Sequence, residues 1–173
     1  MPHVALVSGA PGSGKSTLAH PLAAQLDAAL LSKDRIKETL YDALNGSPAD
    51  LAFSRQIGGA AMHVLWTVAA TCPRVVLEAN FRPNSNYERQ RIADLGATVV
   101  EVHCRCPPEE AGRRFRERAA AQHPAHPLSS LSPDALAEYD RPMGMGPVIE
   151  VDTTRPVNID AIVEQVRALW QDP

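Results

Sequence analysis

Gly9-Ala10-Pro11-Gly12-Ser13-Gly14-Lys15-Ser16 matches the pattern G-x-x-x-x-G-K-[ST] at every specified position. The apolar run Val4–Val7 precedes it, and a helical pattern begins at about Lys15. Glycines let the backbone turn with its N–H groups directed inward, which makes an anion cradle at the positive end of a helix. The stretch therefore predicts a nucleoside triphosphate site rather than a plain glycine-rich turn.

Each part of this loop has an expected task in holding ATP and Mg²⁺. Lys15 reaches the outer phosphates, the Ser16 hydroxyl takes one site on Mg²⁺, and Thr17 contacts the α-phosphate. The residues expected to contact the nucleotide here are Gly9, Ala10, Pro11, Gly12, Ser13, Gly14, Lys15, Ser16 and Thr17. Kinases, switch GTPases, motors and transferases share such a loop, so the rest of the chain must distinguish among them.

Short apolar runs alternate with helical patterns along the whole chain. The expected strands are Val4–Val7, Ala29–Leu31, Val75–Leu77, about Thr98–His103 and Val148–Val151. Continuous apolar runs are typical of strands buried on both faces of a parallel sheet. We therefore predict an α/β, three-layer fold with a five-stranded parallel sheet. The 173 residues contain no repeat and no long linker, so we expect one domain over residues 1–173.

Two helical patterns between the second and third strands predict buried faces. Asp34 opens a helix whose apolar face carries Ile36, Leu40 and Leu44. The longer helix after it has an expected inner face of Phe53, Ile57, Ala61, Val64, Leu65 and Val68.

Charge and composition restrict the partners. The net charge of −3 disfavours nucleic acid as the main partner, because binding to a phosphate backbone usually leaves an excess of Lys and Arg. No apolar run approaches the roughly 18 residues of a membrane span, and the N-terminus lacks the features of a signal peptide. We expect a cytoplasmic protein, monomeric or homodimeric, with a small-molecule partner.

Asp34 follows the second strand at its carboxyl end, where ligands bind in open parallel sheets. The phosphate loop lies at the same edge, so Asp34 should face the γ-phosphate across a cleft. A carboxylate there can accept the proton of an attacking hydroxyl. The alternative is that Asp34 only caps its own helix.

Val75-Val76-Leu77-Glu78 is a short apolar strand that ends in an acid, the pattern of a Walker B element. Magnesium usually keeps several waters, so Glu78 is expected to hold one of them. The alternative is a strand-end carboxylate in a surface ion pair. Asn80-Phe81-Arg82-Pro83 follows at the same edge.

A basic helix is expected from about Pro108 to Ala121, with Arg114 and Arg118 on one face. Two guanidinium groups there can close over a triphosphate and stabilise its charge during transfer. The alternative is ordinary surface pairing of Glu110 with Arg114 and of Glu109 with Arg113. His123 and His126 have no acid or cysteine close by in the sequence, which favours a flap loop over a metal site.

Gly9–Thr17 followed by Ser32-Lys33-Asp34-Arg35-Ile36-Lys37 resembles the kinase family that includes polynucleotide 5′-hydroxyl kinase, chloramphenicol phosphotransferase and the zeta toxins. The resemblance implies an adenylate-kinase-like fold with a helical lid at about 108–133, and it implies that Asp34 is the general base. Lys37 matches a basic position that in some members touches an acidic substrate group, although a solvated helix face is the alternative.

The same resemblance implies roles for five further positions. The loop with Asn80 and Arg82 meets the substrate in this family, and similar lid arginines support Arg114 and Arg118 as catalytic groups. The segment Asp152–Pro156 resembles the one that borders the adenine base, where Arg155 would stack on the ring.

The expected activity is ATP- and Mg²⁺-dependent transfer of the γ-phosphate to the hydroxyl of a metabolite, antibiotic or nucleoside-like compound. A polynucleotide 5′-hydroxyl kinase and a zeta-toxin-like kinase stay open as alternatives. A third is an ATPase or switch module without an acceptor, although the chain has no Asn-Lys-x-Asp motif of the kind that GTPases use to read the base.

Overall fold

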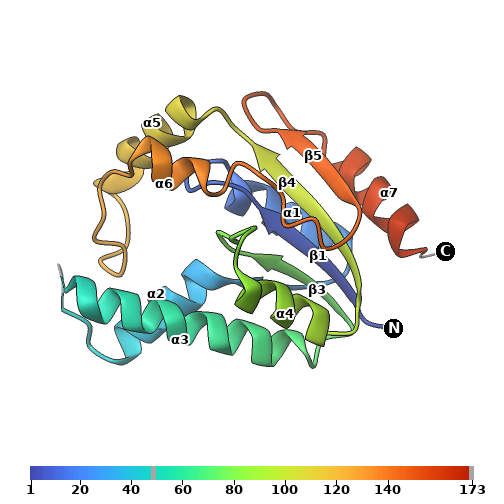
Figure 1. The fold of residues 1–173 in the computed structure, drawn as a ribbon, viewed down its shortest axis with the longest axis horizontal. Helices are drawn as coiled ribbons and strands as arrows, with labels where there is room; N and C mark the ends of the chain where they lie inside the picture. The colour runs from blue at the N-terminus through green and yellow to red at the C-terminus, as the bar shows by residue number, and fades with distance from the viewer. Residues whose placement is uncertain (48–49, 172–173) are drawn as a thin grey trace.

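The computed structural model describes residues 1–47 and 50–171 and forms a single sheet (Figure 1). Its five strands are all parallel and lie in the order β2-β3-β1-β4-β5. They span β1 His3–Ser8, β2 Ala29–Ser32, β3 Arg74–Glu78, β4 Thr98–Arg105 and β5 Val148–Asp152. The predicted α/β class with a five-stranded parallel sheet is confirmed.

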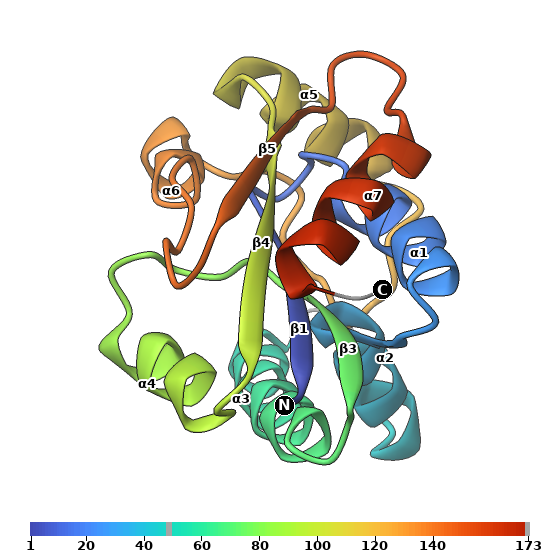
Figure 2. The same ribbon diagram turned by 90° about the vertical axis from the view of Figure 1, so that its right-hand side faces the viewer.

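Helices cover both faces of the sheet (Figure 2). On one face, Ala5 and Val7 of β1 pack in a cluster with α1 (Lys15–Gln25) and α7 (Ile159–Trp170). On the other, Val4 and Leu6 pack in a cluster with α3 (Leu51–Ala69) and α4 (Asn86–Asp94). Successive side chains of a strand point to opposite faces. This two-sided burial explains why the central strands are apolar throughout.

The carboxyl ends of the strands gather the segments that matter for function. The loop after β1 leads into α1, and β2 leads directly into α2 (Lys33–Ala43). After β4, α5 (Pro108–Ala119) and α6 (Pro133–Ala137) stand over this edge, and the segment between them descends towards α2 and α3 (Figure 1). Ligands of open parallel sheets bind at such an edge.

Apolar periodicity predicts neither α4 nor α6. The first is a nine-residue charged helix and the second has only five residues, so neither shows a clear apolar stripe. Both are capped locally, since Ser85 accepts a hydrogen bond from the Glu88 N–H and Ser132 accepts one from the Ala135 N–H. The pattern Ser85-x-x-Glu88 is a capping-box signal that identifies the start of α4.

The buried faces of α2 and α3 differ from those predicted. Val64 and Val68 are 39% and 38% exposed, while Ser54 and Trp66 of the same helix are buried. In α2 the buried residues are Lys37 and Tyr41, and Leu44 is 59% exposed. The reason is that α2 packs mainly on α3 rather than on the sheet, so its inner side borders a polar cleft.

Within residues 1–47 and 50–171, none of the helices combines the length and the apolar character needed to span a membrane.

Candidate active site

The loop between β1 and α1 has a backbone shape that requires glycine. Gly12 and Gly14 have φ of +86° and +89°, in the left-handed region that other residues rarely adopt. A Cβ on Gly12 would lie 2.2 Å from the carbonyl oxygen of Ala111, which belongs to α5. The loop is thus pressed against α5 and keeps the shape of an anion cradle.

Lys15 is buried at the start of α1, and its Nζ donates to the Ala10 carbonyl at 2.8 Å. Burial lowers the pKa of Lys15 below its ordinary value, although the negative charges of Glu78 and Asp34 act in the opposite direction. A buried ammonium that bonds only to a carbonyl of its own loop has hydrogen-bonding capacity left for a phosphate. The cradle and Lys15 therefore fit a triphosphate.

Glu78 at the end of β3 joins the phosphate loop to α2. The Ser16 hydroxyl donates to Glu78 Oε1 at 3.1 Å, and the Ser32 hydroxyl donates to Oε2. Glu78 is 3% exposed, so the alternative of a surface ion pair is wrong. Oxygen ligands of this kind suit Mg²⁺, which usually keeps several waters. Ser16 would hold the ion directly, and Glu78 is placed to orient Ser16 or a metal-bound water.

Asp34 lies in the first turn of α2 and faces the same cleft. Among the described residues, the structure gives its carboxylate one hydrogen bond, from Lys33 Nζ at 2.9 Å. It makes no cap bond to its own helix, since the N-cap position belongs to Ser32. Burial alone would raise the pKa of Asp34, but the Lys33 ammonium outweighs it and holds the pKa below the ordinary value. The Asp34 carboxyl group is therefore ionised at neutral pH.

A single cleft of about 800 Å³ brings most of the predicted residues together. Those that line it are Pro11, Gly12, Gly14, Lys15, Ser16, Thr17, Asp34, Lys37, Glu78, Asn80, Arg82 and Arg118. Gly9, Ala10 and Ser13 belong to the loop but do not line this cleft.

The structure separates Arg118 from Arg114. Arg118 lines the cleft, and no hydrogen bond or ion pair of its side chain occurs within residues 1–47 and 50–171. Arg114 instead binds Glu110 Oε1 at 2.6 Å and donates to the Thr153 carbonyl at 3.2 Å, outside the cleft lining. Arg114 thus forms the ion pair with Glu110 that the sequence offered as the alternative to a lid role.

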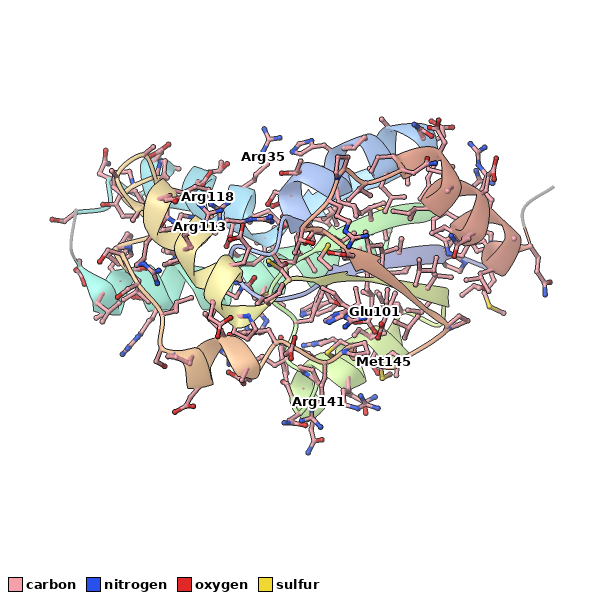
Figure 3. The ribbon with its side chains drawn as sticks, turned by 90° about the horizontal axis from the view of Figure 1, so that it is seen from above. Arg35, Glu101, Arg113, Arg118, Arg141 and Met145 are labelled. Atoms are coloured by element: carbon pink, nitrogen blue, oxygen red, sulfur yellow. The ribbon has the colours of Figure 1, made fainter. Side chains whose placement is uncertain are left out.

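Arg113 and Arg155 lie on the surface away from the cleft lining. Arg113 projects from α5 (Figure 3) and pairs with Glu110 and Glu117, not with Glu109 as the spacing suggested. The side chain of Arg155 is 84% exposed, with its Nε 3.8 Å from an oxygen of Asp152. This ion pair ties Arg155 to the end of β5 rather than to the phosphate loop.

Opposite the phosphate loop, the cleft is lined by residues of α2, α3 and the segment after β3. Lys37 is 7% exposed and donates to the Ser54 hydroxyl at 2.8 Å, so a solvated helix face is the wrong description. The Arg82 backbone N–H donates to Glu88, and its side chain lies 3.7 Å from Glu138. This half of the cleft mixes cations, carboxylates and apolar groups.

The segment between α5 and α6 docks on α2. His123 lies 3.1 Å from Asp42 and His126 lies 3.0 Å from Glu38, so each histidine has the acidic partner that sequence distance concealed. Ala125 between them is fully buried, and its carbonyl accepts a hydrogen bond from Ser54. Among the described residues, no group of three or more His, Cys, Asp and Glu could hold a metal. The flap loop stays a prediction, and its docking on α2 is the contact that a test of it would have to break.

Sequence reasoning missed the α3 side of the cleft. Arg55, Gly58, Gly59 and Met62 line it together with Ser54. The usable signal was the pair Gly58-Gly59 inside a helical pattern, since glycine destabilises a helix interior and often marks a functional reason.

Known proteins resemble this chain in sequence and in fold. The family model described as AAA domain matches residues 4–142. A candidate kinase from Chloroflexus aurantiacus J-10-fl is 32% identical, with a TM-score of 0.83, over 96% of this chain and 97% of that one. The chain has no significant match among curated proteins.

Two more distant solved structures share the fold. The APS kinase CysC of Mycobacterium tuberculosis, in complex with AMPPNP and APS, is 22% identical with a TM-score of 0.63, over 99% of this chain and 98% of that one. A gluconokinase from Sinorhizobium meliloti 1021 is 17% identical with a TM-score of 0.61, over 98% and 92%. At these identities the likeness concerns the fold alone. The matches do not separate polynucleotide kinase, chloramphenicol phosphotransferase and zeta toxin relatives from one another.

Proposed function

The chain belongs to the AAA domain family, and from this premise we propose that it is an ATP-dependent kinase that phosphorylates a hydroxyl of a small molecule. The observation that carries the proposal is the joint position of Asp34 and the phosphate loop in one cleft. The 32% identical relative, itself described as a candidate kinase, supports the same class of reaction.

In the proposed reaction, the acceptor oxygen forms a bond to the γ-phosphorus while the bond from that phosphorus to the β–γ bridging oxygen breaks. ADP carries away the electron pair of the broken bond, and the Asp34 carboxylate takes the proton of the hydroxyl. Lys15 and Arg118 bring positive charge to the transferring group. When bound, Mg²⁺ supplies further positive charge to the triphosphate, and Ser16 and Glu78 are the residues that would hold it.

We also propose that residues 108–133 act as a lid on a single domain. Three observations support this role. Ala111 of α5 packs on Gly12, Arg118 and Phe115 line the cleft, and the segment after α5 reaches α2. A lid that spans both halves of a cleft excludes water when it closes.

Arg114 and Arg155 remain proposals for the nucleotide side. A Cβ on Gly14 would lie 3.6 Å from Thr153, and Arg114 binds the Thr153 carbonyl, so the segment after β5 borders the phosphate loop. In this proposal the adenine ring lies next to this segment, where Arg155 would stack on it, and Arg114 would approach the triphosphate.

The cleft also argues against a switch or ATPase without an acceptor. It continues past Asp34 to Leu51 and Met62 on α3 and to Tyr139 beyond α6. A module that only hydrolyses a nucleotide has no use for this additional volume, whereas a kinase requires it for its second substrate.

The test is transfer of labelled γ-phosphate from ATP to pooled nucleosides, antibiotics, sugars, hydroxy acids and oligonucleotides. Asp34→Asn should lower kcat by about 10²- to 10⁴-fold, because the amide cannot take the proton. Transfer at the wild-type rate by Asp34→Asn would exclude the mechanism.

Lys33→Met is the matched control for Asp34→Asn. It keeps the carboxylate but removes the ammonium that lowers the Asp34 pKa. The base is active when ionised, so a higher pKa should shift the acidic limb of the kcat profile to higher pH. An unshifted limb would show that Asp34 does not control that limb.

A further inference from the structure

Lys37 is a buried cation that has no ion pair with an acid in the part of the chain that the structure describes. Among the described residues, its ammonium has one hydrogen bond, to the Ser54 hydroxyl, whose own proton goes to the Ala125 carbonyl. The two nearest acids on α2 are already paired, Asp34 with Lys33 and Glu38 with His126. An ammonium has three N–H donors, and burying a charge is costly unless it is paired.

Arg55 is a second cation at the same side of the cleft. It is exposed, it lines the cleft next to Ser54, and no ion pair of its side chain occurs in residues 1–47 and 50–171. Two other arginines line the cleft as well: Arg82 has Glu138 within 3.7 Å, and Arg35 of α2 is exposed. Lys37 is thus the buried cation of α2 in this half of the cleft, and Arg55 follows its hydrogen-bond partner Ser54 on α3.

The helix face next to these cations is open. Gly58 and Gly59 follow Arg55 by three and four positions, which places them on the same face of α3. A Cβ on Gly58 would lie 3.8 Å from Cε of Lys37, and one on Gly59 would meet no atom within 4 Å. Glycine in a helix interior costs about 1 kcal/mol relative to alanine. The pair thus gives up helix stability and leaves room beside Lys37.

From these observations we infer that the phosphoryl acceptor is an anionic hydroxyl compound, whose carboxylate or phosphate group binds between Lys37 and Arg55. The inference rests on the proposed function, since it adds the charge of the acceptor to a reaction already assigned to this cleft. The anion supplies the missing partner of Lys37, while the acceptor hydroxyl is directed to Asp34 one helical turn earlier. A carboxylate and a phosphate present the same oxygen acceptors, so both sources need separate arms in the test.

The first experiment compares matched acceptors in phosphoryl transfer from labelled ATP. One arm uses hydroxy acids against their uncharged amides, and the other uses sugar phosphates against the parent sugars. The anionic member of a pair should have a kcat/KM about tenfold higher or more, a difference that one charged contact can supply. Equal use of charged and neutral members in both arms would overturn the inference.

Variants assign the effect to the two cations. Lys37→Met and Arg55→Gln should each raise KM for the anionic acceptor and leave KM for ATP unchanged, and Lys37→Arg should restore much of the loss. Arg141→Gln is the matched control, because it removes an exposed arginine that lies outside the cleft lining. An unchanged KM for the anionic acceptor in both Lys37→Met and Arg55→Gln would contradict the assignment.

The pH dependence of KM for the anionic acceptor distinguishes anion binding by Lys37 from a purely structural role of this residue. Burial, and next the charge of Lys33, lower the pKa of Lys37 to about 8, while the charges of Asp34 and Glu38 act against this. The protonated form binds the anion, so KM for the anionic acceptor should rise as the pH increases through about 8. His126, whose pKa is lowered by burial, titrates further down. A wild-type KM that stays flat across this range would count against Lys37.

Calorimetric binding separates this inference from the proposed function. Non-transferable carboxylates and phosphates are titrated into wild type and Lys37→Met with a non-hydrolysable ATP analogue bound. Weaker anion binding by the variant supports the anion site even if no acceptor is phosphorylated, in which case only the kinase reaction fails. Equal or absent binding in both proteins overturns the site, whatever the transfer assay shows.

Discussion

Gly12 illustrates how one atom decides whether the phosphate loop can form. Its φ of +86° is unfavourable for any residue with a side chain, and a Cβ would meet the Ala111 carbonyl oxygen at 2.2 Å. The neighbour is backbone of α5, so it cannot rotate away as a side chain could. Position 12 therefore carries two separate constraints, one from the dihedral angle and one from the contact.

Gly12→Ala tests these constraints against Gly96→Ala. Gly96 also has a positive φ, +55°, but a Cβ there would have no atom within 4 Å. Gly96→Ala should cost only the left-handed term, about 1–2 kcal/mol of the free energy of unfolding. Gly12→Ala should cost more and should also weaken ATP binding, as measured by urea denaturation and by calorimetry. Equal losses in both variants, with ATP binding intact, would show that α5 yields at this contact.

At the same scale, site residues that are adjacent in the sequence are easier to predict than residues that meet only when helices pack together. The phosphate loop could be predicted because eight consecutive residues specify it, and Asp34 because it follows a strand of the same sheet. Arg55 could not, since its place in the cleft depends on how α3 packs against α2. The pairings of His123 and His126 were hidden for the same reason, because their acids lie more than 80 positions earlier.

At the scale of elements, the fold follows the sequence where an element is packed in the apolar core and departs where it borders the cleft. The strands have continuous apolar runs and were predicted closely. The face of α2 was predicted wrongly, because it buries Lys37 and Tyr41 against α3 and the cleft. Helix α4 shows how a charged helix depends on a local cap rather than on an apolar stripe.

Helix α5 contains a pair of arginines that helical spacing treats alike. They are one turn apart, yet Arg118 lines the cleft and Arg114 is held by Glu110 and the Thr153 carbonyl. Arg118→Ala should lower kcat and leave the stability of the protein nearly unchanged, since its side chain has no partner among the described residues. Arg114→Ala should lower the melting temperature and change kcat less.

Steady-state kinetics and thermal melts on both variants check this division of tasks. Arg113→Ala serves as a control for loss of charge from α5, because Arg113 lies outside the cleft lining and pairs only with Glu110 and Glu117. The division is wrong if Arg114→Ala lowers kcat more than Arg118→Ala does.

At the scale of the whole molecule, the proposed lid at residues 108–133 is part of a long excursion, residues 106–147, between two neighbouring strands. It leaves the sheet after β4 and returns to it at β5, which pairs with β4. Its return is fixed in the core by Glu101 of β4, which lies close to the segment that carries Met145 (Figure 3). Glu101 is fully buried and accepts hydrogen bonds from the backbone N–H groups of Met143 and Gly144 at 2.8 and 2.9 Å.

The same carboxylate also accepts a hydrogen bond from the Ser8 hydroxyl at 2.5 Å, immediately before the phosphate loop. One buried side chain therefore joins the end of this excursion to the end of β1, from which the phosphate loop begins. When a buried donor loses its acceptor, the protein loses more stability than the hydrogen bond itself contributes, because water cannot replace the lost partner.

Glu101→Gln tests this connection. An amide keeps the shape but turns one acceptor oxygen into a donor, so at least one of the three donors loses its partner. The free energy of unfolding should fall by about 1–3 kcal/mol in urea denaturation. Amide exchange at Met143 and Gly144 should be faster in Glu101→Gln than in wild type, while exchange within the strands of the sheet changes less. Ser8→Ala removes one donor while both backbone N–H groups stay paired, so it should cost less and leave those two amides protected. If amide exchange at Met143 and Gly144 is equally slow in wild type and Glu101→Gln, the prediction is wrong. Backbone packing, not this carboxylate, would then hold these two residues in place.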